Sequence, residues 1–113
     1  MHRKKINAKK VVKEYLKCFP SNIKVDGVFL FGSYATGKAR EDSDIDIVVI
    51  SPDFKEIDFI KRMEMLSHFR QAKITRSVPM DIIGYTPEEF ANIDKESVIM
   101  KQAKREGRMI FQG

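Results

Sequence analysis

The sequence is poor in cysteine and has no long apolar runs, so two classes of protein can be set aside at once. Its one cysteine, Cys18, excludes an internal disulfide framework and fits a reducing compartment. Its apolar runs fall well short of the roughly 20 residues that a helix needs to cross a bilayer. The first ten residues carry charge with no apolar stretch behind them, unlike a secretory signal. We therefore expect a cytoplasmic protein without membrane contact.

Linkers, repeats and low-complexity tracts are also missing. The four prolines and six glycines are scattered, so no flexible stretch divides the chain. With 113 residues, of which 42% are hydrophobic and 33% charged, the composition is that of a soluble globular protein. A chain of this size buries about two thirds of its surface on folding. We expect one domain covering residues 1–113.

Acidic residues are outnumbered, and the imbalance is uneven along the chain. Lys and Arg number 21 against 16 acids, a net charge of +5. The excess gathers in the first 17 and the last 13 residues. It indicates solvated helix faces or a polyanionic partner, which could be nucleic acid, a nucleotide or a nucleoside triphosphate. Between these ends lie four acids, whose mutual repulsion is costly unless cations sit among them: Glu41, Asp42, Asp44 and Asp46.

Hydrophobic periodicity predicts alternating helices and strands. Apolar residues spaced three and four apart predict helices over 8–19 and 54–72, a short helix beginning at Thr86, and another over 95–106. Short apolar runs predict strands over 25–31, 45–50, 78–85 and 109–111. This order predicts an α/β (α+β) fold in which a small mixed β-sheet is flanked by helices.

Two carboxylates stand on the same side of the second predicted strand. Residues two apart in a strand point to one face, so Asp44 and Asp46 lie roughly 6–7 Å apart while Ile45 and Ile47 point to the core. Such a pair repels unless a divalent cation or a shared proton compensates. Oxygen ligands of this kind suit Mg²⁺ or Mn²⁺ better than zinc.

A glycine–serine bend precedes these acids. Gly32 and Ser33 directly follow the first predicted strand and open a helical turn. Glycine lets the backbone approach a ligand closely, and the first amides of a helix point at an anion. This pattern indicates a phosphate cradle that is not the P-loop form, because GxxxxGK[ST] is absent.

A third acid, Asp81, interrupts the otherwise apolar strand over 78–85. Such a carboxylate must be exposed, paired or metal-bound. If its strand lies beside Asp44 and Asp46, Asp81 can share a metal and accept a proton from an attacking hydroxyl. Three carboxylates beside a phosphate cradle are the parts of two-metal phosphoryl transfer.

Taken together, these motifs resemble a known superfamily. Gly32-Ser33, ten intervening residues, Asp44-Ile45-Asp46 and a later Asp81 resemble the DNA polymerase β-type nucleotidyltransferases, and the short length resembles their minimal members in bacteria and archaea. The resemblance implies a polymerase β-like palm fold, with Asp44 and Asp46 binding two metals. It also implies that Asp81 binds the catalytic metal and helps to deprotonate the acceptor, while Gly32 and Ser33 hold the β- and γ-phosphates.

The resemblance also implies a reaction and a partner. A nucleoside monophosphate, AMP from ATP, is transferred to a hydroxyl acceptor with release of pyrophosphate. Many minimal members are encoded beside a HEPN-domain protein and form toxin–antitoxin pairs, although a second copy of the chain could also supply contacts. The antitoxin subgroup often reads Gly-Ser-x-Ala-Arg-Gly, and Thr36 stands here in place of that arginine.

Two other functions fit parts of the sequence. A non-catalytic nucleotide-binding or partner-masking module would need the cradle but not three mutually repelling carboxylates. A nucleic-acid binder would use the basic ends, but no recognition motif supports it. Near the cradle, Lys38 and Arg40 could meet phosphate or be solvated, and Tyr34 could stack on a base or pack in the core.

Overall fold

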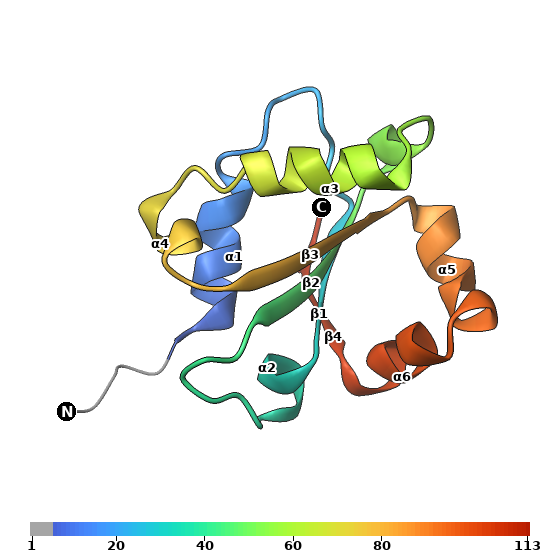
Figure 1. Cartoon of the computed structure of the whole chain (residues 1–113). Helices are drawn as coiled ribbons and strands as arrows, with labels where there is room; N and C mark the ends of the chain where they lie inside the picture. Colours follow the sequence, from blue (N-terminus) through green and yellow to red (C-terminus); the bar gives the residue numbers. More distant parts are fainter. Residues whose placement is uncertain (1–5) are drawn as a thin grey trace.

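The computed structural model describes residues 6–113, so Arg3, Lys4 and Lys5 of the basic N-terminal cluster lie outside the described residues. Its strands are β1 (Gly27–Phe31), β2 (Ile45–Ile50), β3 (Met80–Tyr85) and β4 (Arg108–Gln112). Figure 1 shows the helices around them: α1 (Ala8–Leu16), α2 (Ser33–Thr36), the 3₁₀ turn η1 (Pro52–Phe54), α3 (Phe59–His68), α4 (Lys73–Arg76), α5 (Pro87–Glu96) and α6 (Val98–Glu106).

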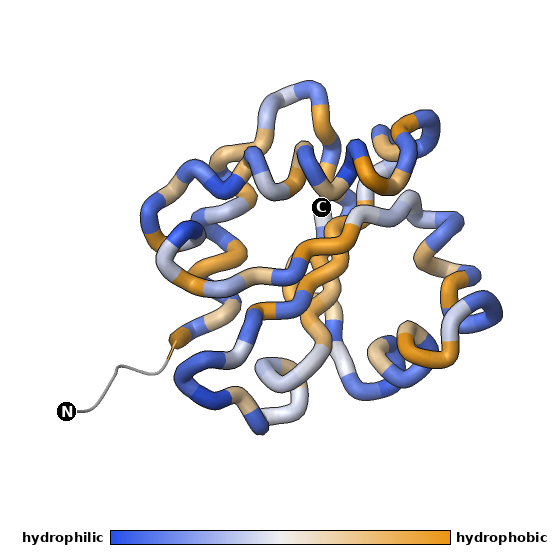
Figure 2. The backbone as a smooth tube through the Cα atoms, viewed as in Figure 1, coloured by the Kyte–Doolittle hydropathy of each residue, from blue (hydrophilic) through white to orange (hydrophobic). Residues whose placement is uncertain are grey.

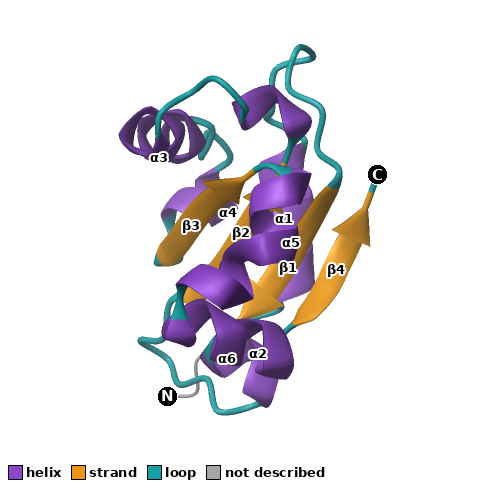
Figure 3. Ribbon diagram, turned by 90° about the vertical axis from the view of Figure 1, so that its right-hand side faces the viewer, coloured by secondary structure: helices purple, strands orange, loops and turns teal. Residues whose placement is uncertain are grey.

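The four strands form a mixed sheet in the order β3-β2-β1-β4, so β3 and β4 are its edges (Figure 3). Strand β1 pairs antiparallel with both β2 and β4, whereas β2 pairs parallel with β3. The small mixed sheet flanked by helices that the sequence predicts is therefore confirmed.

Each face of the sheet has its own core. On one face, buried side chains of α1 and α3 pack on β1 and β2, with Tyr15, Phe54 and Leu66 fully buried. On the other face, Ile93 of α5 and Met100 of α6 pack on alternate residues of the same strands. Figure 2 shows the hydrophobic colour concentrated along the central strands. A sheet that is covered on both faces needs apolar side chains pointing to each face.

The predicted helix over 54–72 is wrong at its start. Pro52 opens the short turn η1, and α3 begins only after Asp58, whose side chain accepts a hydrogen bond from Lys61 N. Phe54 is consequently fully buried, whereas Phe59 is exposed. Helix α4, which the periodicity does not predict, follows α3.

The last predicted helix also begins at a different residue. Ser97, and not Lys95, starts it: the Ser97 hydroxyl accepts from Met100 N, as an N-cap does, and separates α5 from α6. Among residues 6–113, no helix is both long and apolar enough to cross a membrane.

Candidate active site

Strand register brings Asp46 and Asp81 side by side. In the parallel ladder between β2 and β3, Asp46 is the direct partner of Asp81, so both side chains stand on the same face of the sheet. Asp44 lies two residues before Asp46, just outside the start of β2. Ile45 and Ile47 alternate with them and are fully buried on the opposite face. The adjacency expected of the three acids is observed.

These carboxylates repel one another. Asp44 and Asp81 are exposed, and Asp46 between them is half-buried. Burial, followed by the negative charges of Asp81 and Asp44, raises the pKa of Asp46 from its ordinary 3.8 to about 6. A divalent cation between the oxygens would remove this penalty.

The glycine–serine bend stands directly against Asp46. Phe31, the last residue of β1, pairs with Asp46, and Gly32 follows with a φ of 71° and a ψ of −157°. A Cβ at Gly32 would overlap the Oδ2 atom of Asp46. Ala35 N and Thr36 N both donate to Gly32 O, at 3.0 and 3.2 Å, and fold α2 into one turn. Glycine is thus required both by the backbone angles and by the carboxylate beside it.

The donor set fits magnesium or manganese. All three side chains offer oxygen, the ligand that these hard cations prefer. Within residues 6–113, no three His, Cys, Asp or Glu side chains already stand as a closed metal site. Asp46 and Asp81 share a face of the sheet, and Asp44 lies two residues before Asp46. Asp44, Asp46 and Asp81 are the residues that could hold the metal.

The structure also places the three other residues that the sequence sets near the cradle, Tyr34, Lys38 and Arg40. Tyr34 packs against the core on the α1 side, as the packed alternative predicts. Arg40 lines a cavity on that same side together with Lys9, while Lys38 is exposed. Sequence reasoning gave Arg108 no role, yet its Nη1 donates to Ala35 O at 3.1 Å and ties β4 to the end of α2. No sequence pattern signals that long-range contact.

Comparison with known proteins assigns the family. The model of the nucleotidyltransferase domain family matches residues 12–107, which include Gly32, Ser33 and the three carboxylates. The chain belongs to the nucleotidyltransferase family. The resemblance seen in the motifs is thereby confirmed.

Relatives of this nucleotidyltransferase include proteins named as protein adenylyltransferases. One from Methanocaldococcus jannaschii, assigned as a protein adenylyltransferase (MJ1215), is 40% identical over 58 residues, which are 50% of this chain and 64% of that protein. "Probable protein adenylyltransferase MntA" of Haemophilus influenzae is 30% identical over 77 residues, which are 68% of this chain and 66% of that protein. The matches span less than two thirds of the length of these relatives.

Solved structures share the fold. A protein assigned as a nucleotidyltransferase from Sulfolobus solfataricus superposes with a TM-score of 0.59 and 27% identity, covering 93% of this chain and 77% of that one. A toxin–antitoxin structure with AMP-PNP superposes with a TM-score of 0.59 and 23% identity, covering 96% of this chain and 75% of that one. The second likeness shows the fold alone.

Proposed function

We propose that this protein is a minimal nucleotidyltransferase that transfers AMP from ATP to a hydroxyl group of an acceptor and releases pyrophosphate. The observation that carries the proposal is the register of β2 and β3, in which Asp46 faces Asp81 with Asp44 two residues away. Membership of the nucleotidyltransferase family supports the reaction class. Relatives named as adenylyltransferases support AMP as the transferred group.

Each site residue has a role in this proposal. Asp44 and Asp46 are the residues that would hold two Mg²⁺ ions, and Asp81 would share the catalytic one. The ions, when bound, supply charge neutralisation and Lewis acidity to the triphosphate. Asp81 is exposed, so an acceptor hydroxyl can reach it and give up its proton to this carboxylate. Gly32 and Ser33 orient the β- and γ-phosphates, because Gly32 lets the backbone lie against Asp46.

We also propose that the acceptor is a protein, and specifically a HEPN-domain toxin encoded beside this one. The names of the relatives as protein adenylyltransferases and the toxin–antitoxin structures of the same fold support this class of acceptor. A second copy of the chain is the other candidate partner, which would supply part of the acceptor site. Cytoplasmic location fits both.

Transfer of label from ATP tests the reaction. The protein is incubated with ATP labelled at the α-phosphate, Mg²⁺ and the purified product of the neighbouring gene, and labelled protein is counted. The Asp46→Asn variant should lose transfer, whereas Asp42→Asn, which removes an exposed acid of the loop before β2, should retain it. Equal labelling by both variants would contradict the assigned roles.

Calorimetric titration with ATP distinguishes catalysis from a binding module. We expect binding that needs Mg²⁺ and is lost in Asp46→Asn. Binding of equal strength without metal, combined with no transfer, would replace the enzyme with a non-catalytic nucleotide-binding or partner-masking module.

A further inference from the structure

A groove runs between helix α1 and the edge strand β4, on the face of the sheet opposite the three carboxylates. Its volume is about 460 Å³, within the range of ligand and peptide pockets. Its apolar lining comes from both elements: Val12, Leu16, Ile110 and Phe111. We call this hollow the α1–β4 groove.

A β-bulge gives the groove its aromatic wall. Along the β1–β4 ladder, Phe111 pairs with Val28 and Met109 pairs with Phe29, so Ile110 is an extra residue. Paired residues share a face, and Val28 belongs to the core on the α1 side whereas Phe29 belongs to the other core. The bulge therefore turns Phe111 towards α1, the side on which Ile110 also packs, and Phe111 remains 39% exposed there.

The rim of the groove is positively charged. Lys9, Lys13 and Lys17 also line it, spaced four apart and so aligned along one side of α1. Lys17 is bonded to Glu14 at 2.9 Å. Among residues 6–113, neither Lys9 nor Lys13 has an acidic partner within ion-pair distance.

The charge continues past the groove. An adjoining cavity of about 550 Å³ shares Lys9 with it and is lined by Arg40 and Arg108, with Glu41 as the acid in its lining. Along the groove, β4 bonds to β1 on one side only and ends the sheet (Figure 3). An edge strand of this kind offers unpaired N–H and C=O groups to another extended chain.

We propose that the α1–β4 groove docks an extended segment of a partner protein whose groove-facing side, made of every second residue, carries both apolar and acidic side chains. Its backbone adds to β4, its apolar side chains fill the floor, and its carboxylates meet Lys9 and Lys13. A nucleic acid would use the lysines but neither the apolar floor nor the strand edge, so the peptide is favoured. Because the groove and the carboxylates lie on opposite faces, a docked partner leaves the nucleotide site open.

Fluorescence anisotropy with a labelled peptide of about six residues tests the proposal, with valine and glutamate taking turns at every second position and threonine between them, so that both face the groove. We expect saturable binding that weakens about tenfold in the double variant Lys9→Glu/Lys13→Glu. The matched control is Lys10→Glu on the same helix, which lies outside the groove lining and should bind normally. Phe111→Ser tests the floor and should also weaken binding. Asp46→Asn should bind like the wild type, which separates this proposal from the proposed catalysis.

Three results would overturn the docking site. The first is no saturation up to about 1 mM peptide. The second is equal loss in the Lys10→Glu control, which would indicate diffuse charge attraction. The third is tighter binding of single-stranded DNA at the same sites, with a steep fall in affinity between about 50 and about 200 mM salt, which would make the groove a nucleic-acid surface.

Discussion

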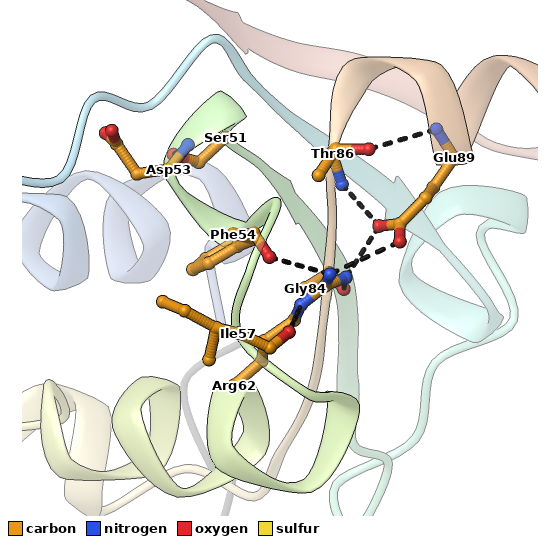
Figure 4. Close-up of polar contacts among 8 residues, drawn as sticks. All are labelled: Ser51, Asp53, Phe54, Ile57, Arg62, Gly84, Thr86 and Glu89. Carbon is orange, nitrogen blue, oxygen red and sulfur yellow. Dashed lines mark hydrogen bonds and ion pairs between the residues drawn. The ribbon is translucent and has the colours of Figure 1, made fainter.

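Two charged clusters lie in this small domain, and they are built on opposite plans. The Arg62 cluster joins α3, η1, β3 and α5, and every charge in it has a partner (Figure 4). The carboxylate cluster of Asp44, Asp46 and Asp81 gathers three charges of one sign. The comparison separates charge that stabilises the fold from charge that is kept at a cost to the fold.

The Arg62 guanidinium is fully satisfied although its side chain is only 6% exposed. It donates to Ile57 O at 2.7 Å, Phe54 O at 2.7 Å and Gly84 O at 3.2 Å, and it forms an ion pair with Glu89 at 2.6 Å. Hydrogen bonding to Arg62 lowers the pKa of Glu89. The same carboxylate accepts from Thr86 N and completes the capping box of α5. These contacts hold four elements together. Both charges are neutralised by their partners, so neither is available for catalysis.

The largest effect is expected from breaking the carboxylate cluster at Asp81. Asp81→Asn should lower labelled-AMP transfer about 1,000-fold, because under the proposed roles the variant loses a metal ligand and the proton acceptor. Its free energy of unfolding should stay unchanged or rise slightly, because a repelling charge is gone. Single-turnover kinetics and urea unfolding measure the two quantities. A variant that unfolds more readily would mean that this cluster, like that of Arg62, is structural.

Breaking the Arg62 cluster should do the reverse. Arg62→Met leaves Glu89 without its cation and three carbonyl oxygens without a donor, so we expect a loss of about 3 kcal/mol in the free energy of unfolding. The matched control, Lys61→Met, removes an exposed pair with Glu64 at 3.8 Å and should change stability by less than about 0.5 kcal/mol.

Metal-dependent ATP affinity of the folded Arg62→Met protein should match that of the wild type. If the binding free energy of ATP falls by more than the free energy of unfolding does, Arg62 acts on the nucleotide site. The Arg62 cluster would then not be purely structural.

The two clusters also differ in how far the sequence predicts them. The carboxylate cluster follows from local rules: alternation puts Asp44 and Asp46 on one face, and an acid amid apolar neighbours marks Asp81. The Arg62 cluster depends on contacts between residues up to 27 positions apart, and Arg62 reads as one more solvated cation of a helix. Its partners are mostly backbone carbonyls, which every residue has and no pattern distinguishes.

Local sequence patterns also miss other features of the structure, for the same reason. Strand order, which brings Asp81 beside Asp46, is a global property that the sequence left open and the structure supplies. Helix starts at Asp58 and Ser97 depend on single side-chain caps, and Phe54 is buried because η1 turns it inwards. The fold class could be predicted, and local alternation could nominate the three acids of the candidate site, whereas the α1–β4 groove depends on a bulge that alternation alone hides.

A smaller effect is expected at the bend against Asp46. Gly32→Ala should lower the free energy of unfolding by about 2 kcal/mol, because its φ of 71° with ψ of −157° is nearly restricted to glycine and the new Cβ overlaps the carboxylate. ATP binding should be lost as well. The matched control is Gly37→Ala, with a φ of 79° and open space around its Cα, which should cost about 1 kcal/mol and retain ATP binding. Loss of binding in both would point to general unfolding of α2.

The smallest expected effect is a change in the free energy of unfolding with pH, caused by Asp46 in the carboxylate cluster. The pKa of Asp46 is raised to about 6 in the folded chain, against 3.8 when unconstrained, so the folded state binds more protons between these values. Metal-free protein should therefore lose stability as pH rises from about 4 to about 6. Since solvent screens this half-buried carboxylate, we expect a loss of about 1 kcal/mol, less than the shift in pKa alone implies.

Asp46→Asn should remove this pH dependence: the variant should match the wild type below about pH 4 and exceed it by about 1 kcal/mol above about pH 6. Urea unfolding across this range measures both, with Asp42→Asn as the control that keeps the wild-type profile. Excess Mg²⁺ should flatten the wild-type profile too, since a cation between the carboxylates stabilises their charged forms. A profile that Mg²⁺ leaves unchanged would show that the three acids do not share a cation, and the carboxylate cluster would have no more claim to catalysis than that of Arg62.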